Sequence, residues 1–237
     1  MTERGELLRR YLCQQAELGG GRIFLDGMTA AQALTALDAF ASDSAPVDAA
    51  LAAPGPLREV RAVALGCVAC RLHETRTQVV FGEGSETADV VVVGEAPGQE
   101  EDRTGRPFVG RAGKLLDLLL MTAGFPRDQV YICNVLKCRP PENRNPLPDE
   151  MAACAGYLHA QLEGVAPKVL LAVGKFAAQQ LVGSEESIGR LRGRVFSYRG
   201  TPLVVTYHPA YLLRSPQMTR VAWEDFQLLR KVLHEHS

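Results

Sequence analysis

Short apolar segments alternate with amphipathic segments from residue 88 to the end of this chain, and this alternation constrains the fold more than any other feature. The apolar segments are rich in Val, Ile and Leu, which favours β-strands. They occupy 88–94, 129–136, 168–173 and 202–207. Helical patterns follow at 111–123, 149–163, 175–182 and 222–235. We therefore expect an α/β fold of three α/β/α layers with a central four-stranded, mainly parallel sheet.

The first 57 residues have a different character. Two helical patterns, Glu3–Leu18 and Thr29–Phe40, precede a stretch of linker composition that is rich in Ser, Pro and Ala. We expect 1–57 to form an N-terminal helical and linker extension, and 58–237 to form the main domain. Cys13 lies on the apolar side of the first helical pattern, which indicates a packed thiol.

Composition and charge exclude some classes of protein. No apolar run approaches the roughly 18 residues of a membrane span, and the N-terminus lacks the apolar core of a signal peptide, so a cytoplasmic protein without membrane contact is expected. The net charge of −1 hides an asymmetry. Residues 1–100 carry 8 Lys and Arg against 14 Asp and Glu, whereas residues 101–237 carry 18 against 13. The second part could face a polyanion, although solvated surface charge explains so small an excess equally well.

Chemically capable side chains follow the predicted strands at the point where each strand ends. Glu95 follows the first strand, Asn134 ends the second, Lys175 lies just past the third, and His208 follows the fourth. The carboxyl ends of parallel strands meet in one crevice. We therefore expect Glu95, Asn134 and His208 to converge there.

The segment 94–113 joins the first strand to the next helix and is rich in glycine. Glycines let a backbone approach a ligand closely, and amides at a helix start can hold an anion. The segment also carries Glu95 and the aromatic Phe108. This composition is typical of a ligand-binding loop, the alternative being a polar turn.

The cysteines form two groups. Cys67 and Cys70 make a CxxC pair, and Cys138 and Cys154 lie farther along, which in a cytoplasmic protein indicates a metal site or a redox pair. A redox CxxC would sit between a strand and a helix, and this one does not. Four thiolates suit zinc or an iron–sulfur cluster, and spacing alone does not separate these. Cys133 lies within a predicted buried strand and is expected in the core.

Several motifs together resemble those of family 4 uracil-DNA glycosylases. They are residues 94–98 (GEAPG), 106–113 (RPFVGRAG), Asn134, 137–141 (KCRPP), Asn143-Arg144 and 207–214 (YHPAYLLR). The resemblance runs from about Leu65 to Leu233 and includes the four outlying cysteines. It implies that a [4Fe-4S] cluster, rather than zinc, is ligated by Cys67, Cys70, Cys138 and Cys154.

The resemblance implies a monofunctional DNA-repair enzyme that flips uracil out of DNA and hydrolyses its N-glycosidic bond, leaving an abasic site. Phe108 would stack on the base, and Asn134 would read the uracil edge, since its amide can donate to O4 and accept from N3–H. His208 would donate a hydrogen bond to O2 as negative charge develops on the leaving base. Glu95 would orient the attacking water.

Other roles follow from the same resemblance. Gly94, Glu95 and Ala96 would frame the base, and Glu100 or Glu101 would crowd the C5 position and exclude thymine. Leu212 or Leu213 would wedge into the vacated base stack, with Arg214 on the phosphates. A basic loop, which is either a further phosphate contact or simply solvated, contains Arg190, Arg192 and Arg194. The expected partner is uracil-containing DNA, single- or double-stranded, bound by a monomer.

Two related branches and two other classes of protein are the alternatives. Family 5 enzymes lack the glutamate found here as Glu95. A branch that links covalently to abasic DNA carries a Lys-Arg-Arg-Ile-His insertion, whereas this chain has 138–144 (CRPPENR) at that place, so turnover is expected. A non-catalytic nucleic-acid-binding module, stapled by a metal on four cysteines, would explain the cysteines but not the three residues at the strand ends. An electron-transfer protein, the other alternative, would have a reversible cluster and no glycosylase activity.

Overall fold

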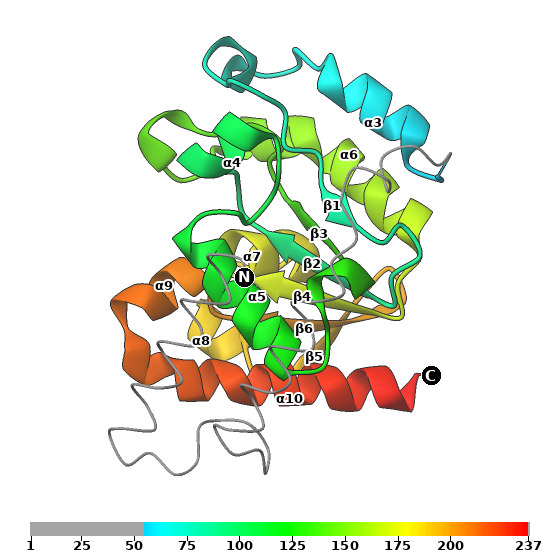
Figure 1. Ribbon diagram of the computed structural model, residues 1–237, viewed down its shortest axis with the longest axis vertical. Coiled ribbons are helices and arrows are strands. Elements are labelled where there is room, and N and C mark those ends of the chain that lie inside the picture. Colours follow the sequence, from blue (N-terminus) through cyan, green and yellow to red (C-terminus); the bar gives the residue numbers. More distant parts are fainter. Residues whose placement is uncertain (1–54, 237) are drawn as a thin grey trace, which may run out of the picture. The chain divides into compact units, whose positions relative to one another are not determined.

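The computed structural model describes residues 55–236 of the chain (Figure 1). The helices expected within residues 1–40, the linker after them and Cys13 lie outside the described residues. The proposed boundary at residues 57 and 58 stays a prediction. Within the described part, no helix is both long enough and apolar enough to cross a lipid bilayer.

One sheet of six strands forms the centre of the described structure. Its order is β1-β3-β2-β4-β6-β5, with the inner four strands parallel and the two edge strands antiparallel to their neighbours. The strands are β1 (Glu83–Gly84), β2 (Val90–Gly94), β3 (Val130–Asn134), β4 (Val169–Val173), β5 (Val195–Tyr198) and β6 (Thr201–Thr206).

The predicted α/β fold is confirmed, and the four predicted strands are β2, β3, β4 and β6. The sheet is wider than expected because each edge gains a short antiparallel strand. β1 spans only two residues, too few to leave a pattern in the sequence. β5 forms a tight hairpin with β6 and is only partly buried, so it lacks the apolar run that marked the inner strands.

Helices cover both faces of the sheet, as Figure 1 shows for α3 and α6 on one side and α5 and α10 on the other. The α-helices are α3 (Arg58–Leu65), α4 (Gln99–Thr104), α5 (Arg111–Thr122), α6 (Pro148–Val165), α7 (Lys175–Val182), α8 (Ile188–Leu191), α9 (Pro209–Arg214) and α10 (Thr219–Glu235). Short 3₁₀ helices are η2 (Arg71–Glu74), η3 (Arg127–Gln129), η4 (Pro141–Asn143) and η5 (Pro216–Met218). The three predicted layers are therefore present.

Two large apolar cores lie on the two faces of the sheet because side chains alternate along each strand. Val91 and Val93 pack with α3, α6 and α7, whereas Val90 and Val92 pack with α5 and α10. A smaller third core contains Leu72, Val79, Leu136, Cys138 and Cys154. This third core joins the segment before β1 to the loop after β3 and to α6.

Strand register places the inner strand ends level with one another. Gly94 of β2 pairs with Asn134 of β3, and Val173 of β4 pairs with Thr206 of β6. The residues that follow these strands therefore emerge at the same edge of the sheet. This edge carries the candidate site.

Candidate active site and cysteine pocket

Gly94, Asn134 and Phe108 meet at the carboxyl end of β2. A Cβ atom added to Gly94 would lie 2.4 Å from Asn134 Oδ1 and 2.4 Å from Phe108 Cζ, so only glycine fits there. Asn134 is 1% exposed, and its Oδ1 is buried without a hydrogen-bond partner. A buried polar atom without a partner is costly, so this oxygen is placed to receive a ligand.

The loop that carries Phe108 is held from two sides. Glu101 Oε1 accepts from the backbone N–H groups of Val109 and Gly110, both at 2.8 Å. Arg127 donates through Nη1 to the Phe108 carbonyl at 3.2 Å and through Nη2 to the Pro107 carbonyl at 2.6 Å. Phe108 has a φ of 50°, which an L-residue adopts only when its surroundings enforce it. The ring is thereby fixed before any ligand binds.

Glu101 was expected to face the base at C5. In the structure one of its carboxylate oxygens is committed to the Phe108 loop, which makes this side chain a support for the aromatic floor. The contact with the base stays a prediction. Glu100 is exposed and forms a salt bridge with Arg103 at 2.8 Å. None of its contacts among the described residues directs the side chain towards Asn134 or Phe108.

His208 caps α9 at its N-terminus and lies against the Phe108 ring. Its ring centroid is 5.7 Å from that of Phe108, and a Cβ on Gly174 would come within 2.9 Å of the His208 Cβ. The backbone N–H of Ala210 donates to Nδ1 at 3.1 Å. Because Nδ1 accepts, the ring proton of the neutral imidazole sits on Nε2, which leaves an N–H donor for a ligand.

Electrostatics keep His208 neutral. Burial and, to a smaller extent, the Arg214 charge lower its pKa from 6.5 to about 4, whereas Glu101 acts in the opposite direction. Glu95, which follows β2 directly, is half-buried, and burial raises the pKa of its carboxyl. Ala96 packs against the third core. Phe108 thus lies beside both Gly94 with Asn134 and His208, and Glu95 follows Gly94 directly in the chain, whereas a meeting of the three side chains stays a prediction.

The residues expected on DNA lie in α9, and one of them needs correction. Leu212 is 1% exposed because its side chain packs in the core that contains α5 and α10, so it is not available to DNA. Leu213 is 40% exposed, and Arg214 is also exposed.

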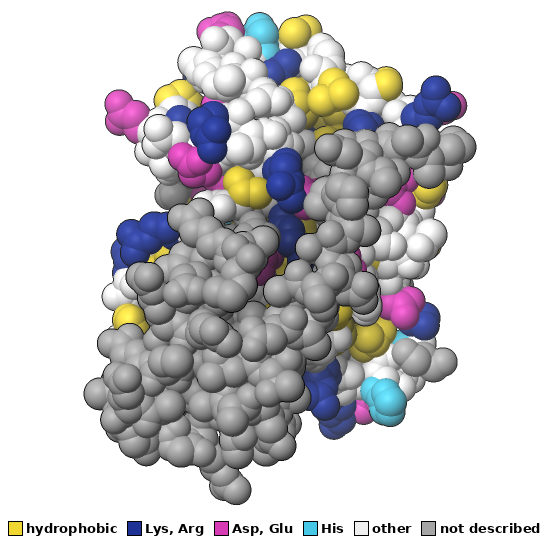
Figure 2. All heavy atoms as spheres, in the orientation of Figure 1, with side chains coloured by type: hydrophobic (Ala, Val, Ile, Leu, Met, Phe, Trp, Pro, Cys, Tyr) yellow, Lys and Arg dark blue, Asp and Glu magenta, His cyan; other side chains and the backbone are white. Residues whose placement is uncertain are grey.

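The predicted basic loop is also divided. Arg192 is engaged with Asp225, donating through Nε at 3.0 Å and through Nη2 at 2.9 Å, and so acts as a structural bridge to α10. Arg190 and Arg194 are exposed. Figure 2 shows the Lys and Arg side chains of one face interspersed with acidic and apolar ones, outside the part drawn in grey.

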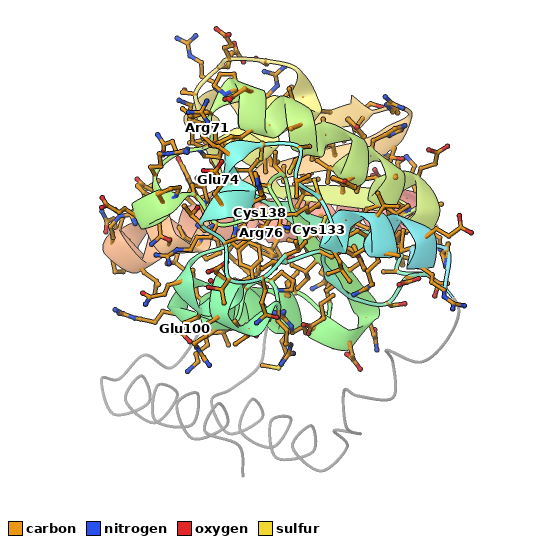
Figure 3. All side chains as sticks on the ribbon, turned by 90° about the horizontal axis from the view of Figure 1, so that it is seen from above. Arg71, Glu74, Arg76, Glu100, Cys133 and Cys138 are labelled. Carbon is orange, nitrogen blue, oxygen red and sulfur yellow. The ribbon has the colours of Figure 1, made fainter. Side chains whose placement is uncertain are left out.

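The four outlying cysteines line one pocket on the other side of the β3 end. The pocket is also lined by Arg76, Lys137, Tyr157 and three alanines; its cysteines are Cys67, Cys70, Cys138 and Cys154. Arg76 Nη1 donates to Cys138 Sγ at 3.3 Å (Figure 3), and the backbone N–H of Ala69 donates to Cys67 Sγ at 3.5 Å. Cys133 of β3 is instead fully buried in the apolar core on the side of α6 and α7, as expected.

Ionisation of these thiols needs a positive partner. Burial raises the pKa of Cys138, and it raises that of Cys154 to about 11. Within residues 55–236, no three His, Cys, Asp or Glu side chains are arranged around a point where a single metal ion would sit. The donor set is therefore the four thiols that line this pocket.

Three functional contacts were not anticipated from the sequence. Lys137 is 2% exposed and lines the cysteine pocket, although a lone lysine usually indicates surface. Arg127 supports the Phe108 loop, and Gly174 makes room for His208. The motif 137–141 contained a signal for Lys137, since a lysine between an apolar run and a cysteine is unusual.

Comparisons with known proteins agree with this geometry. The model of the uracil DNA glycosylase superfamily matches residues 81–227. The type-4 uracil-DNA glycosylase of Thermotoga maritima is 51% identical over 165 residues, covering 68% of this chain and 86% of that protein. That of Archaeoglobus fulgidus is 44% identical over 171 residues, covering 69% and 86%. A type-5 uracil-DNA glycosylase of Pyrobaculum aerophilum is 33% identical over 147 residues, covering 54% and 64%. The match to the superfamily model and the identity to these type-4 enzymes show that the chain belongs to the type-4 uracil-DNA glycosylases within the uracil DNA glycosylase superfamily.

Proposed function

We propose that this protein excises uracil from DNA by hydrolysing the N-glycosidic bond of a flipped deoxyuridine, releasing uracil and leaving an abasic site. The observation that carries this proposal is the buried, unpartnered Oδ1 of Asn134 beside the Phe108 ring. A flat ring seated there would stack on an aromatic face and complete the hydrogen bonding of a carboxamide.

Recognition follows from the two ends of the Asn134 amide. Oδ1 accepts from uracil N3–H, and Nδ2 donates to uracil O4. Cytosine presents an acceptor at N3 and a donor at C4, so it would face Asn134 with both groups reversed. An amide held in one orientation therefore rejects cytosine, because the buried polar atoms would be left unpaired.

His208 assists departure of the base. Its Nε2–H donates to uracil O2 while the electrons of the breaking C1′–N1 bond move onto the uracil ring. The low pKa of His208 means that a neutral donor does this work, because a buried imidazolium would itself be costly. The backbone donor on Nδ1 prevents the other tautomer.

Glu95 acts on the sugar side. Its ionised carboxylate orients a water whose oxygen bonds to C1′, and the water's proton leaves through the carboxylate and ends on the released uracil. The carboxylate also stabilises the positive charge that develops on the sugar. No covalent bond to the protein forms, so the enzyme turns over.

The four pocket cysteines fit a [4Fe-4S] cluster. Four thiols that line one pocket are the donor set that such a cluster takes, and Cys67, Cys70, Cys138 and Cys154 would hold it. Bound there, the cluster would supply a covalent tie between the segment before β1, which carries Cys67 and Cys70, and the loop and helix after β3, which carry Cys138 and Cys154.

DNA contacts lie beside the pocket. Leu213 is the exposed apolar side chain at the end of α9 and would fill the space left by the flipped base, with Arg214 on the phosphates. The remaining part of this proposal is a cytoplasmic monomer whose substrate is uracil-containing DNA, single- or double-stranded.

The test is abasic-site formation on a uracil-containing oligonucleotide by the holoprotein, with a matched oligonucleotide that carries cytosine at the same position as control. We expect strand breaks after alkali only with uracil, and no protein–DNA adduct on a denaturing gel. Binding to both oligonucleotides without any abasic sites would instead support the metal-stapled binding module.

A further inference from the structure

Lys137 contacts Asn134 and also lines the cysteine pocket. It follows Asn134 by three residues, and its side chain folds back so that Nζ donates to the Asn134 backbone carbonyl at 2.6 Å. The same side chain is 2% exposed and lines the pocket of the four cysteines. One ammonium therefore touches the backbone of the base-reading residue and faces the thiol groups.

The hydrogen bond that Lys137 makes compensates its buried positive charge only in part. The carbonyl that accepts from its Nζ is neutral, and the pocket that Lys137 lines also contains Cys67, Cys70, Cys138 and Cys154. Cys133 packs in the main core, so the negative charge available to Lys137 would come from the pocket cysteines once they are bound as thiolates. A buried charge needs a compensating partner, and four metal-bound thiolates provide one.

We propose that Lys137 is a positioning residue for uracil recognition, held in place by the negative charge of the cysteine-bound cluster and fixing Asn134 through its backbone carbonyl. The inference rests on the proposed function of the site. Asn134 lies at the last paired position of β3, so the ammonium anchors this residue where the ladder between β2 and β3 ends. The cluster thus supports substrate recognition without taking part in the reaction.

Arg76 provides a matched comparison. It is also a cation beside the cysteines, since Nη1 donates to Cys138 Sγ at 3.3 Å. Arg76 precedes β1, and its hydrogen bond within the described residues leads to the cysteine pocket instead of to Asn134. Both cations should stabilise the reduced, more negative state of the cluster, but only Lys137 should affect recognition of the base.

The experiment compares full-length, cluster-loaded wild type, Lys137→Met and Arg76→Met. The midpoint potential of the cluster is followed by visible absorbance, and single-turnover excision is measured on uracil and on cytosine together with affinity for undamaged DNA. We expect both variants to shift the potential to more negative values. Only Lys137→Met should lose excision of uracil, by roughly 10- to 100-fold with unchanged DNA affinity, because a small displacement of Asn134 costs that much.

Lys137→Gln keeps a hydrogen-bond donor without the charge, and it serves if Lys137→Met does not fold. We expect it to shift the potential while it retains more excision activity than the methionine variant. Excision within about twofold of wild type in Lys137→Met, or an equal loss in Arg76→Met, would overturn the proposal. If wild type itself forms no abasic sites, the proposed function fails, which is a different result from an active wild type with unaffected variants.

Discussion

The two pockets that flank the end of β3 are built in opposite ways. The base pocket is complete as the chain folds: Phe108 is held by Glu101 and Arg127, and His208 has its tautomer set by a backbone N–H. In the cysteine pocket, burial raises the pKa values of Cys138 and Cys154 and so disfavours the thiolate form that a metal would need. The folded chain thus holds the side chains of the proposed reaction in position by itself, whereas the cysteine pocket needs a bound metal group to stabilise its thiolates.

The largest expected effect is the loss of one pocket cysteine. Cys154→Ala should abolish the broad absorbance near 400 nm and unfold the region around the third core; structural zinc sites contribute on the order of 10 kcal/mol to folding, and a comparable dependence is expected here. The measurements are iron content, visible absorbance and thermal unfolding.

Cys133→Ala is the matched control for this change, because Cys133 is fully buried but packs in the main core. It should keep the absorbance and lower the stability by roughly 1–2 kcal/mol. Bleaching by Cys133→Ala together with a coloured Cys154→Ala would show that the ligands are assigned wrongly, and the contrast between the pockets would disappear.

The next largest effect concerns the two groups on either side of the breaking bond. Glu95→Ala and His208→Ala should each lower the single-turnover rate by about 10²- to 10³-fold, since each removes a positioned charge or donor. DNA affinity should stay nearly unchanged because phosphate contacts dominate it. Rates within about threefold of wild type, or a loss of binding in proportion to rate, would remove these residues from the chemistry.

How much of this site could be predicted differs between its parts. The positions of Glu95, Asn134 and His208 after the strands β2, β3 and β6 could be predicted because strand patterns mark the strand ends, whereas their roles stay a prediction. Leu212 and Leu213 could not be separated, since the short helix α9 leaves too few residues for a periodic pattern. The burial of Lys137 and the bonds from Glu101 to the Phe108 loop depend on tertiary packing, which no local pattern encodes.

A smaller effect is expected in the dependence of stability on pH. His208 has a pKa of about 4 when folded against 6.5 when unfolded, so between these values the unfolded chain binds the extra proton. Its contribution is fully present above pH 6.5 and is lost as the pH falls to 4, by at most roughly 3 kcal/mol. Denaturant unfolding of wild type and His208→Asn across this range should show a shallower decline in the variant. Parallel declines would mean that the imidazole is not held neutral by its pocket.

The smallest effect concerns the rim of the base pocket, at the end of the helix that His208 caps. Because the protein side of the pocket is already built, the remaining cost of flipping is the unstacking of the base in the DNA duplex. Leu213→Ala should therefore slow excision from double-stranded DNA on the order of tenfold and leave excision from single-stranded DNA unchanged. Leu212→Ala is the matched control: its side chain is 1% exposed, so it should lower stability by about 2–5 kcal/mol without this difference between substrates. An equal slowing on both forms of DNA by Leu213→Ala would assign the wedge to another side chain, of which Tyr211, 36% exposed on the same helix, is the next candidate.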